Sequence, residues 1–345
     1  MEYGRHADRI AGALSHLLHV RAADRNTVEE LRAHYLDLPP ERMFPRPPAI
    51  EHLQAERSLF DRALGITTLR WPSSHRVLGP EYCERHEGEY LRNSVAWARW
   101  MRPDGQQRRH CLVYVHGWLE PGSWAEETTL FRAWTRELGV DMLHVALPFH
   151  GRRKPRSSLF SGEFYWTADL VRSVEAVRQT VCDARAAVEW LRGQGYASVG
   201  VTGISLGGAV DMLLACVEPA PDYVIPIVAH LELEDAVENA PILWRMKRDL
   251  DGFGIGRDER CELFRRLGWS ALLPKLSPER QLWIQARDDG YICAELVERQ
   301  WIEWGRPNIL WIEGGHMTFP LHVGKMTQAM QRFISGLPEW IPAHR

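Results

Sequence analysis

Short apolar segments alternate with helical segments along most of this chain, and the alternation restricts the folds it can adopt. The apolar segments with the length of buried strands are residues 111–115, 141–147, 198–204, 223–229, 281–286 and 308–312. Helical segments separate them, the longest near residues 168–194. Strands that alternate with helices form βαβ units and a parallel sheet covered on both faces. The sequence therefore predicts an α/β fold with a doubly wound, mostly parallel sheet.

The same pattern divides the 345 residues into an extension, a core and an insertion. Residues 1–66 form a helical N-terminal extension interrupted by prolines, with a short helix expected at about 50–64. Residues 67–229 and 276–345 form the core. The core is expected to begin with strands at 69–79 and 89–101, for which an antiparallel pair is one arrangement. Residues 230–275 form an irregular helical insertion rich in apolar residues, which we interpret as a cap or lid.

A serine flanked by glycines is the strongest local signal. Gly203-Ile-Ser205-Leu206-Gly207-Gly208 follows an apolar strand and precedes a helix of small residues. A serine on such a sharp strand-to-helix turn is exposed, and glycines are needed beside it because side chains there would clash. We expect Ser205 to be a nucleophile, and the free N–H of Leu206 at the helix N-terminus to bind an oxyanion. The alternative is a tight turn without chemistry.

A serine hydroxyl needs a base, and the base needs an acid that orients it. Two later loops, each directly after a predicted strand, offer this pair. Arg287-Asp288-Asp289-Gly290 follows one strand, and Glu313-Gly-Gly-His316 follows the last. The order serine, acid, histidine is the one expected on an α/β sheet of this kind. We predict His316 as the base and Asp289 as the acid, with Asp288 as the rival acid.

The loop after the strand at 111–115 is the expected source of a second oxyanion donor. It begins with His116-Gly117-Trp118. We select the backbone N–H of Trp118, because loss of one such donor typically costs 100-fold or more in rate. The Trp118 indole is also a candidate wall of an acyl pocket, and its alternative role is packing.

Taken together, the predicted nucleophile, base, acid and oxyanion loop make the chain resemble the α/β-hydrolase superfamily over about residues 69–335. Two segments, residues 146–155 (Ala-Leu-Pro-Phe-His-Gly-Arg-Arg-Lys-Pro) and 203–208, resemble a narrower branch named for α/β-hydrolase domain-containing protein eighteen. The resemblance implies the α/β-hydrolase fold and a serine hydrolase, and says little about the substrate. The long N-terminal extension and the tryptophan-rich insertion depart from the family pattern, so no substrate is carried over.

Tryptophan is unusually common, with 15 residues against 10 Phe and 9 Tyr. Trp124, Trp166 and Trp244 lie in loops or the cap, on the side expected to hold the site, and we predict that they bind substrate together with His116 and Gly117. This set favours a bulky acyl or aromatic ester. The basic loop Arg152–Arg156 leaves the carboxyl end of a strand. It either holds an anionic group of the substrate or is a solvated loop with internal salt bridges.

Composition narrows the classes of function. A net charge of −3 gives no field that selects nucleic acid, and no cysteine pair has metal-site spacing. The N-terminal segment has no continuous apolar region, and apolar residues nowhere run together for about 18 positions, so we expect no signal peptide, no transmembrane helix and a cytoplasmic protein. We predict a carboxylic ester hydrolase that needs no cofactor or metal. The alternatives are an acyltransferase with the same triad and a non-catalytic ligand-binding protein. Oligomeric state is left open.

Overall fold

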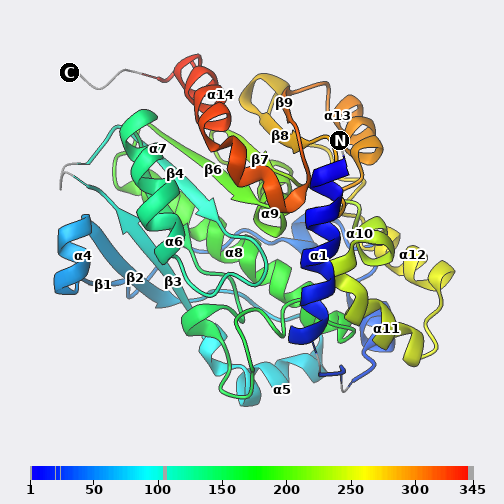
Figure 1. Cartoon of the computed structure of the whole chain (residues 1–345). Coiled ribbons are helices and arrows are strands. Elements are labelled where there is room, and N and C mark those ends of the chain that lie inside the picture. Colours follow the sequence, from blue (N-terminus) through cyan, green and yellow to red (C-terminus); the bar gives the residue numbers. More distant parts are fainter. Residues whose placement is uncertain (1, 20, 24, 104–106, 341–345) are drawn as a thin grey trace.

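A nine-stranded sheet forms the centre of the computed structural model, which describes residues 2–340 apart from 20, 24 and 104–106. Its strand order is β1-β2-β3-β5-β4-β6-β7-β8-β9 (Figure 1). The strands are β1 (Gln54–Glu56), β2 (Ile66–Pro72), β3 (Val95–Met101), β4 (His110–Val115), β5 (Asp141–Val145), β6 (Ser198–Ile204), β7 (Val224–Ile227), β8 (Leu282–Ala286) and β9 (Asn308–Ile312). The strands β4 to β9 pair in parallel, which confirms the predicted α/β fold.

The first three strands are antiparallel and differ from the expected ranges. β2 and β3 pair antiparallel, and the residues between them include a helix, α5 (Pro80–Glu89), in a segment to which the sequence analysis assigned no element. Pro80 at the first helical position is compatible with a helix start because its missing N–H would have no partner there. The helix expected at 50–64 is shorter, α4 (Leu59–Leu64), and Ser58 caps it. β1 occupies the residues before it.

Helices cover both faces of the sheet. The helices in the described part of the chain are α1 (Glu2–Leu18), α2 (Val28–His34), α3 (Pro40–Met43), α6 (Trp124–Glu126), α7 (Arg132–Glu137), α8 (Leu170–Gly193), α9 (Leu206–Ala215), α10 (Leu233–Asn239), α11 (Trp244–Gly252), α12 (Arg257–Arg266), α13 (Ala294–Glu303) and α14 (Val323–Ser335), besides α4 and α5. None in the described part of the chain is long and apolar enough to cross a membrane.

Alternation along β4 shows how the two layers form. Cys111, Val113 and Val115 belong to the apolar cluster that includes α8 and α9. Leu112 and Tyr114 belong to a second cluster, which includes residues of α7 and α14. Successive side chains of a strand point to opposite faces, so a strand that is apolar throughout is buried on both. In Figure 1, α7 and α14 lie in front of the sheet.

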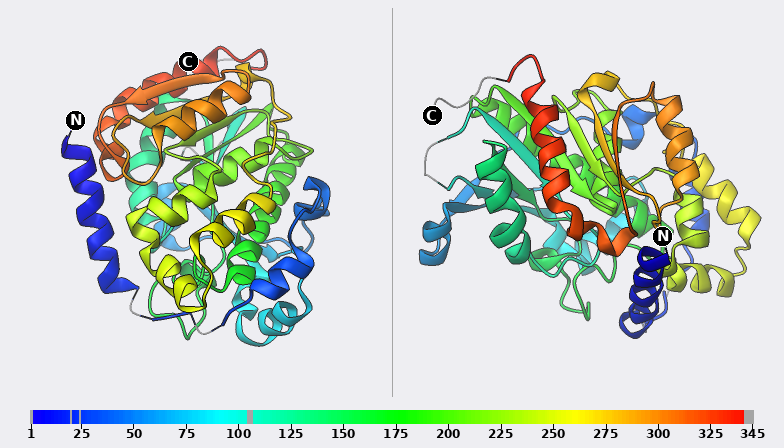
Figure 2. Two further views of the ribbon diagram at one scale, coloured as in Figure 1. Left: turned by 90° about the vertical axis from the view of Figure 1, so that its right-hand side faces the viewer. Right: turned by 45° about the horizontal axis from the view of Figure 1, so that its top comes forward.

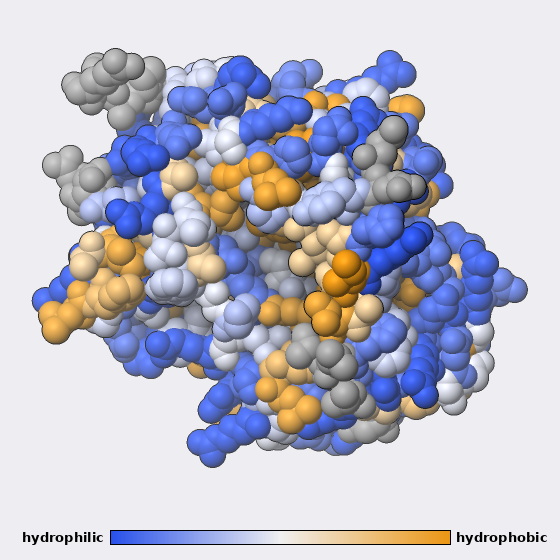
Figure 3. Space-filling model, in the orientation of Figure 1, coloured by the Kyte–Doolittle hydropathy of each residue, from blue (hydrophilic) through white to orange (hydrophobic). Residues whose placement is uncertain are grey.

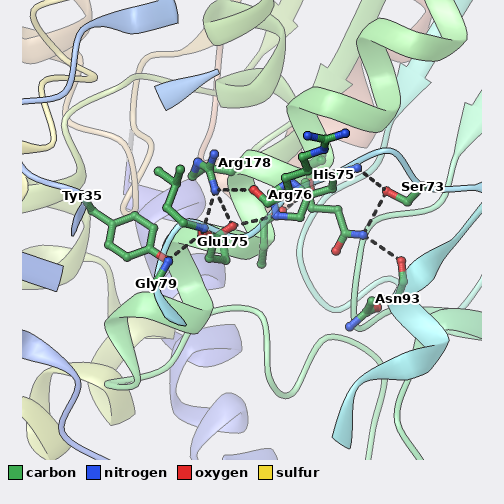
Figure 4. A network of polar contacts seen from close by, with 12 residues as sticks. Tyr35, Ser73, His75, Arg76, Gly79, Asn93, Glu175 and Arg178 are labelled. Carbon is green, nitrogen blue, oxygen red and sulfur yellow. Dashed lines mark hydrogen bonds and ion pairs between the residues drawn. The ribbon is translucent and has the colours of Figure 1, made fainter. Parts of the chain in front are cut away.

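The longest helix, α8, is buried over most of its length and carries a charged centre. Glu175 accepts hydrogen bonds from Tyr35, His75 and Arg178 at 2.6, 2.7 and 2.6 Å and from a backbone N–H (Figure 4). Burial alone would raise the pKa of Glu175, but Arg178 and the His75 bond outweigh it and lower the pKa to about 2. This network fixes the segment around residues 73–79, and the Tyr35 bond extends it to the N-terminal extension.

The cap lies beside the carboxyl ends of the parallel strands. It contains α10, α11, α12 and a short turn, η4 (Pro241–Leu243). The N-terminal helix α1 runs along the outside of the molecule next to this cap (Figure 2). It contacts η4 and also the turn η6 (His316–His322) that follows β9. The first helix of the chain therefore touches both the cap and a loop at the end of the core.

Candidate active site

Ser205 occupies a sharp turn between β6 and α9. Its φ of 56° and ψ of −114° lie in a region that residues with a side chain rarely adopt. Its backbone N–H donates to Ile227 O at 2.9 Å on the neighbouring strand, which holds the turn. Strain of this kind persists only where the surroundings enforce it, and it clusters at functional sites.

Two glycines make this turn sterically feasible. A Cβ atom at Gly207 would lie 1.9 Å from Val115 O, and one at Gly203 would lie 2.5 Å from the same oxygen. Both contacts are with the backbone of β4, which pairs directly with β6 and does not yield as a flexible side chain would. Glycine is therefore required at both positions.

The side chains of Ser205, His316 and Asp289 form a continuous hydrogen-bonded chain. His316 Nε2 lies 2.9 Å from Ser205 Oγ, and His316 Nδ1 lies 2.8 Å from Asp289 Oδ2. The three come from the ends of β6, β8 and β9, brought to one edge of the sheet. The rival acid Asp288 instead donates its backbone N–H to Gly314 O, on the loop before His316.

The Asp289 carboxylate is fixed on both of its oxygens. Oδ1 accepts the backbone N–H groups of Tyr291 and Ile292, each at 2.8 Å, which leaves Oδ2 for His316. Burial would lower the pKa of His316, but the Asp289 charge and hydrogen bond raise it above the ordinary value. The imidazole also packs on the Tyr291 ring, with centroids 4.8 Å apart. The site thus favours positive charge on His316 while keeping its ring in place.

Trp118 is anchored beside Ser205 by its indole. Nε1 donates to Gly162 O at 2.8 Å, and the ring stacks on His19 with centroids 5.0 Å apart. The next residue, Leu119, has a positive φ of 71° and donates its N–H to His150 Nε2. Leu206 is the first residue of α9, so its N–H has no acceptor within the helix. Trp118 and Leu206 line the same cavity as Ser205.

That cavity is apolar and has a volume of about 110 Å³. It lies between α9 and the cap, lined by Trp118, Trp166, Val177, Ser205, Leu206, Ala209, Val210, Leu213, His230, Leu231, Glu232, Leu233, Ala236, Ala240, Ile242, Leu243, Trp269, Tyr291 and Ile292. Residues of the insertion at 230–275 form one wall of this cavity. Three tryptophans, Trp118, Trp166 and Trp269, line the cavity as a whole.

A second cavity of about 240 Å³ adjoins the first and shares Trp118 and Trp166 with it. Its lining differs in character, because it includes charged side chains of both signs, such as Arg172 and Glu163. His19 also lines it, and the buried Nε2 of His19 has no hydrogen-bond partner among the described residues. Trp118 therefore lines both a compact apolar cavity and a larger cavity that has charged side chains in its wall.

Four residues predicted to bind substrate lie outside the apolar cavity. Trp124 is 65% exposed at the start of α6, and Trp244 packs on His16 with ring centroids 4.0 Å apart. His116 is buried, accepts the Leu147 N–H on Nε2 at 3.0 Å, and has Nδ1 2.8 Å from Gly117 O. Burial lowers the pKa of His116 to about 4. A position in the sequence does not reveal the direction of a side chain, and these residues do not line the apolar cavity.

His116 also belongs to a cluster with metal-ligand chemistry. Ligand atoms of His116, Glu120 and His144 lie within 4.8 Å of one another. The Leu147 N–H occupies His116 Nε2, so the neutral ring carries its proton on Nδ1, the atom that faces Glu120. Glu120 accepts from His144 Nε2 at 2.9 Å. Proton-bearing nitrogens are unsuitable ligands, so hydrogen bonding accounts for this cluster without an ion.

The basic loop Arg152–Arg156 makes mostly internal contacts. Arg153 is fully buried and donates to Asp183 at 2.8 Å and to Asn93 O at 2.8 Å. Lys154 donates to Ser158 O, and the Arg152 guanidinium lies over the Trp97 ring at 5.0 Å. Of the two interpretations left open by the sequence, the internal contacts favour a structural loop.

Asp8, on the N-terminal helix α1, is the residue near this site that sequence reasoning missed. Its carboxylate accepts the backbone N–H of His316 at 2.8 Å. No motif marks it, because 308 residues separate the partners in the chain. The one available signal is that a small or polar residue recurs at every third or fourth position of α1, a pattern opposite to the usual apolar stripe.

Comparisons with known proteins agree with this fold. Residues 92–235 match the family model described as "Alpha/beta hydrolase domain containing 18". An uncharacterized protein of Mycobacterium tuberculosis is 29% identical over 296 residues, a match that covers 81% of this chain and 66% of the relative. The chain thus spans just under two thirds of the length of that relative.

Among solved structures, an acetyl xylan esterase from Paenibacillus sp. R4 has a TM-score of 0.58 at 13% identity, covering 93% of this chain and 98% of that chain. Acetyl xylan esterase 1 from Thermoanaerobacterium sp. has a TM-score of 0.56 at 14% identity, covering 89% and 98%. At these identities the likeness concerns the fold. The family model that matches residues 92–235 and the shared fold confirm the resemblance seen in the sequence: the chain has the α/β-hydrolase fold.

Proposed function

We propose that the protein is a serine hydrolase that cleaves carboxylic esters, with Ser205 as nucleophile, His316 as base and Asp289 as orienting acid. The observation that carries the proposal is the unbroken chain of hydrogen bonds from Ser205 Oγ through His316 to Asp289, at 2.9 and 2.8 Å. Nucleophile, base and orienting group within hydrogen-bond reach are the signature of an activated serine.

The chemistry follows from which atoms carry protons. Asp289 Oδ2 keeps a proton on His316 Nδ1, so Nε2 is free to accept the proton of Ser205 Oγ as the oxygen attacks the acyl carbon. His316 then gives this proton to the leaving alcohol, and an acyl-enzyme remains. A water molecule, deprotonated by the same Nε2, attacks the acyl carbon and releases the acid and free Ser205.

We assign the stabilisation of the oxyanion to two backbone N–H groups. Leu206 contributes the first N–H of α9, where the helix dipole also favours negative charge. Trp118 contributes the second, on the loop after β4, and its anchored indole keeps that loop close to Ser205. The oxyanion role of these two groups is part of the proposal.

The two cavities suggest where the acyl group and the alcohol of an ester bind. The apolar cavity beside Ser205 has a volume of about 110 Å³, less than the roughly 150 Å³ of an engineered cavity that binds benzene. We assign it to the acyl group, which must then be short. The adjoining polar cavity of about 240 Å³ is assigned to the alcohol. The sequence favoured a bulky acyl or aromatic ester; we propose instead that the acyl group is short and that any bulk belongs to the alcohol.

Hydrolysis of a panel of p-nitrophenyl esters from acetate to palmitate tests the proposal. We expect activity on acetate to butyrate, a steep fall with longer acyl chains, and loss of activity in Ser205→Ala. Ser335→Ala, an exposed serine at the end of α14, is the matched control and should retain activity. The proposal fails if Ser205→Ala hydrolyses the esters as fast as the wild type.

A further inference from the structure

The buried face of α1 is unusual in its chemistry. The buried residues that recur along it are Gly4, Asp8, Gly12, Ser15 and His19, the last just beyond the helix end. Large apolar side chains of α1 point outward instead: Tyr3, Ile10 and Leu14 are 69%, 62% and 57% exposed. Figure 3 shows hydrophobic side chains at the surface of this face of the molecule, over the region where α1 runs in Figure 1. These three side chains therefore do not contribute to the packing of α1 against the rest of the molecule.

Close backbone contact brings α1 against the loop that carries His316. A Cβ atom at Gly4 would lie 2.1 Å from Gly315 N, so only glycine allows this approach. At Gly12 a Cβ atom would lie 2.4 Å from the Pro241 side chain in the cap. The helix thus lies in direct contact with the residue before His316 at one end and with the cap near the other.

The Asp8 side chain lies at the centre of this contact. Its exposure is 0%, and its carboxylate accepts backbone N–H groups from two loops. Oδ2 accepts from Gly290 and His316, each at 2.8 Å, and Oδ1 accepts from Met317 at 2.7 Å. The Tyr291 hydroxyl donates to the Asp8 backbone oxygen at 3.0 Å. One carboxylate therefore joins the loop of Asp289 to the loop of His316.

We propose that Asp8 is a positioning residue of the active site: it joins the loops of Asp289 and His316, so that the imidazole stays in line with Ser205, and its charge stabilises the imidazolium formed during the reaction. This inference rests on the function proposed above. A misplacement of about 1 Å costs up to about 100-fold in rate, so a carboxylate that fixes both loops has a direct kinetic consequence.

The charge of Asp8 adds to that of Asp289. The groups that face His316 are Asp289 from the loop after β8, Asp8 from α1, the Tyr291 ring and Ser205. Burial raises the pKa of Tyr291, so its phenol stays neutral at the pH of an assay. Asp289 is the larger and Asp8 the smaller of the two charges that raise the pKa of His316 against the effect of burial.

Kinetics of two Asp8 variants separate geometry from charge. Asp8→Asn keeps the size of the side chain but loses the charge. Its NH₂ group also faces a backbone N–H, so one hydrogen bond to the loops is lost. We expect kcat to fall about 10- to 100-fold with little change in KM. We also expect the acidic limb of the profile of kcat/KM against pH to move to lower pH. Asp8→Glu keeps the charge in a longer side chain, so kcat should fall while the acidic limb stays nearer that of the wild type.

Each assay is normalised to folded, reactive protein by counting the sites that a fluorophosphonate labels. Arg9→Gln, on the exposed face of the same helix, is the control and should match the wild type. The inference is overturned if Asp8→Asn has wild-type kcat per labelled site and an unmoved acidic limb, which is the result of a purely structural role. If the wild type itself neither hydrolyses esters nor takes the label, the proposed function fails instead.

Discussion

Replacing Asp289 by asparagine should abolish most activity, because the structure dictates how the new amide must lie. Asp289 Oδ1 accepts two backbone N–H groups, those of Tyr291 and Ile292. In Asp289→Asn the amide oxygen must stay in this place, since the reverse orientation would set an NH₂ group against two donors. The NH₂ group therefore faces His316 Nδ1.

This orientation selects the wrong tautomer of His316. An NH₂ group donates to Nδ1, so the imidazole proton moves to Nε2, which then cannot accept the proton of Ser205. Loss of the correct tautomer in a comparable triad costs about 10⁴-fold in kcat, or about 5 kcal/mol at about 1.4 kcal/mol per tenfold change. The same substitution also removes the charge that stabilises the imidazolium.

The assay is steady-state hydrolysis of p-nitrophenyl butyrate by Asp289→Asn and Asp288→Asn, with urea unfolding to confirm that both variants are folded. We expect about a 10⁴-fold loss for Asp289→Asn and activity within a few-fold of the wild type for Asp288→Asn. The reasoning is refuted if folded Asp289→Asn retains more than about a tenth of the activity, or if Asp288→Asn is the variant that loses it.

Other predictions concern the pocket, the turn, the core and pH. Ala209→Leu narrows the acyl cavity and should reduce kcat/KM for butyrate relative to acetate by about tenfold or more, whereas an unchanged ratio would place the acyl group elsewhere. Gly207→Ala should prevent labelling of Ser205 by a fluorophosphonate, because the new Cβ meets Val115 O at 1.9 Å; normal labelling would refute the turn geometry. Glu175→Gln should lower the free energy of unfolding in urea by about 3–5 kcal/mol by leaving Arg178 unpaired, and a change below 1 kcal/mol would contradict this. In the wild type, the stabilisation from Glu175 is complete above its unfolded pKa of about 4.3 and is lost as the pH falls through its folded pKa of about 2. Since the base must be neutral and the pKa of His316 is raised, kcat/KM should fall as the pH drops through a limb that lies above about 6.5; a limb below that value would contradict the assigned environment.

Local patterns in the sequence were enough to predict the fold and the loops of the site. Each core strand is a continuous apolar segment, and the turn at Ser205 has glycines where neighbouring backbone leaves no room for a side chain. Parallel strands bring their carboxyl ends to one edge, so residues far apart in sequence were expected to meet there. These signals come from covalent geometry and burial.

Contacts between distant segments could not be read in this way. The strand expected at 89–101 begins only at Val95, because pairing with β2 and β5 defines its ends. Trp244 lies in the insertion at 230–275, yet its ring packs on His16 of α1 and does not line the apolar cavity beside Ser205. Asp8 carries no motif, and its role depends on a helix that the sequence showed only as an extension.

The central claim is that Ser205 is an activated nucleophile, and covalent labelling tests it most directly. Folded wild-type protein is incubated with a fluorophosphonate, and intact mass and peptide mapping locate the adduct. We predict one adduct per chain, on Ser205, and none on Ser205→Ala. An unlabelled wild type, or an equal adduct on Ser205→Ala, would contradict the account.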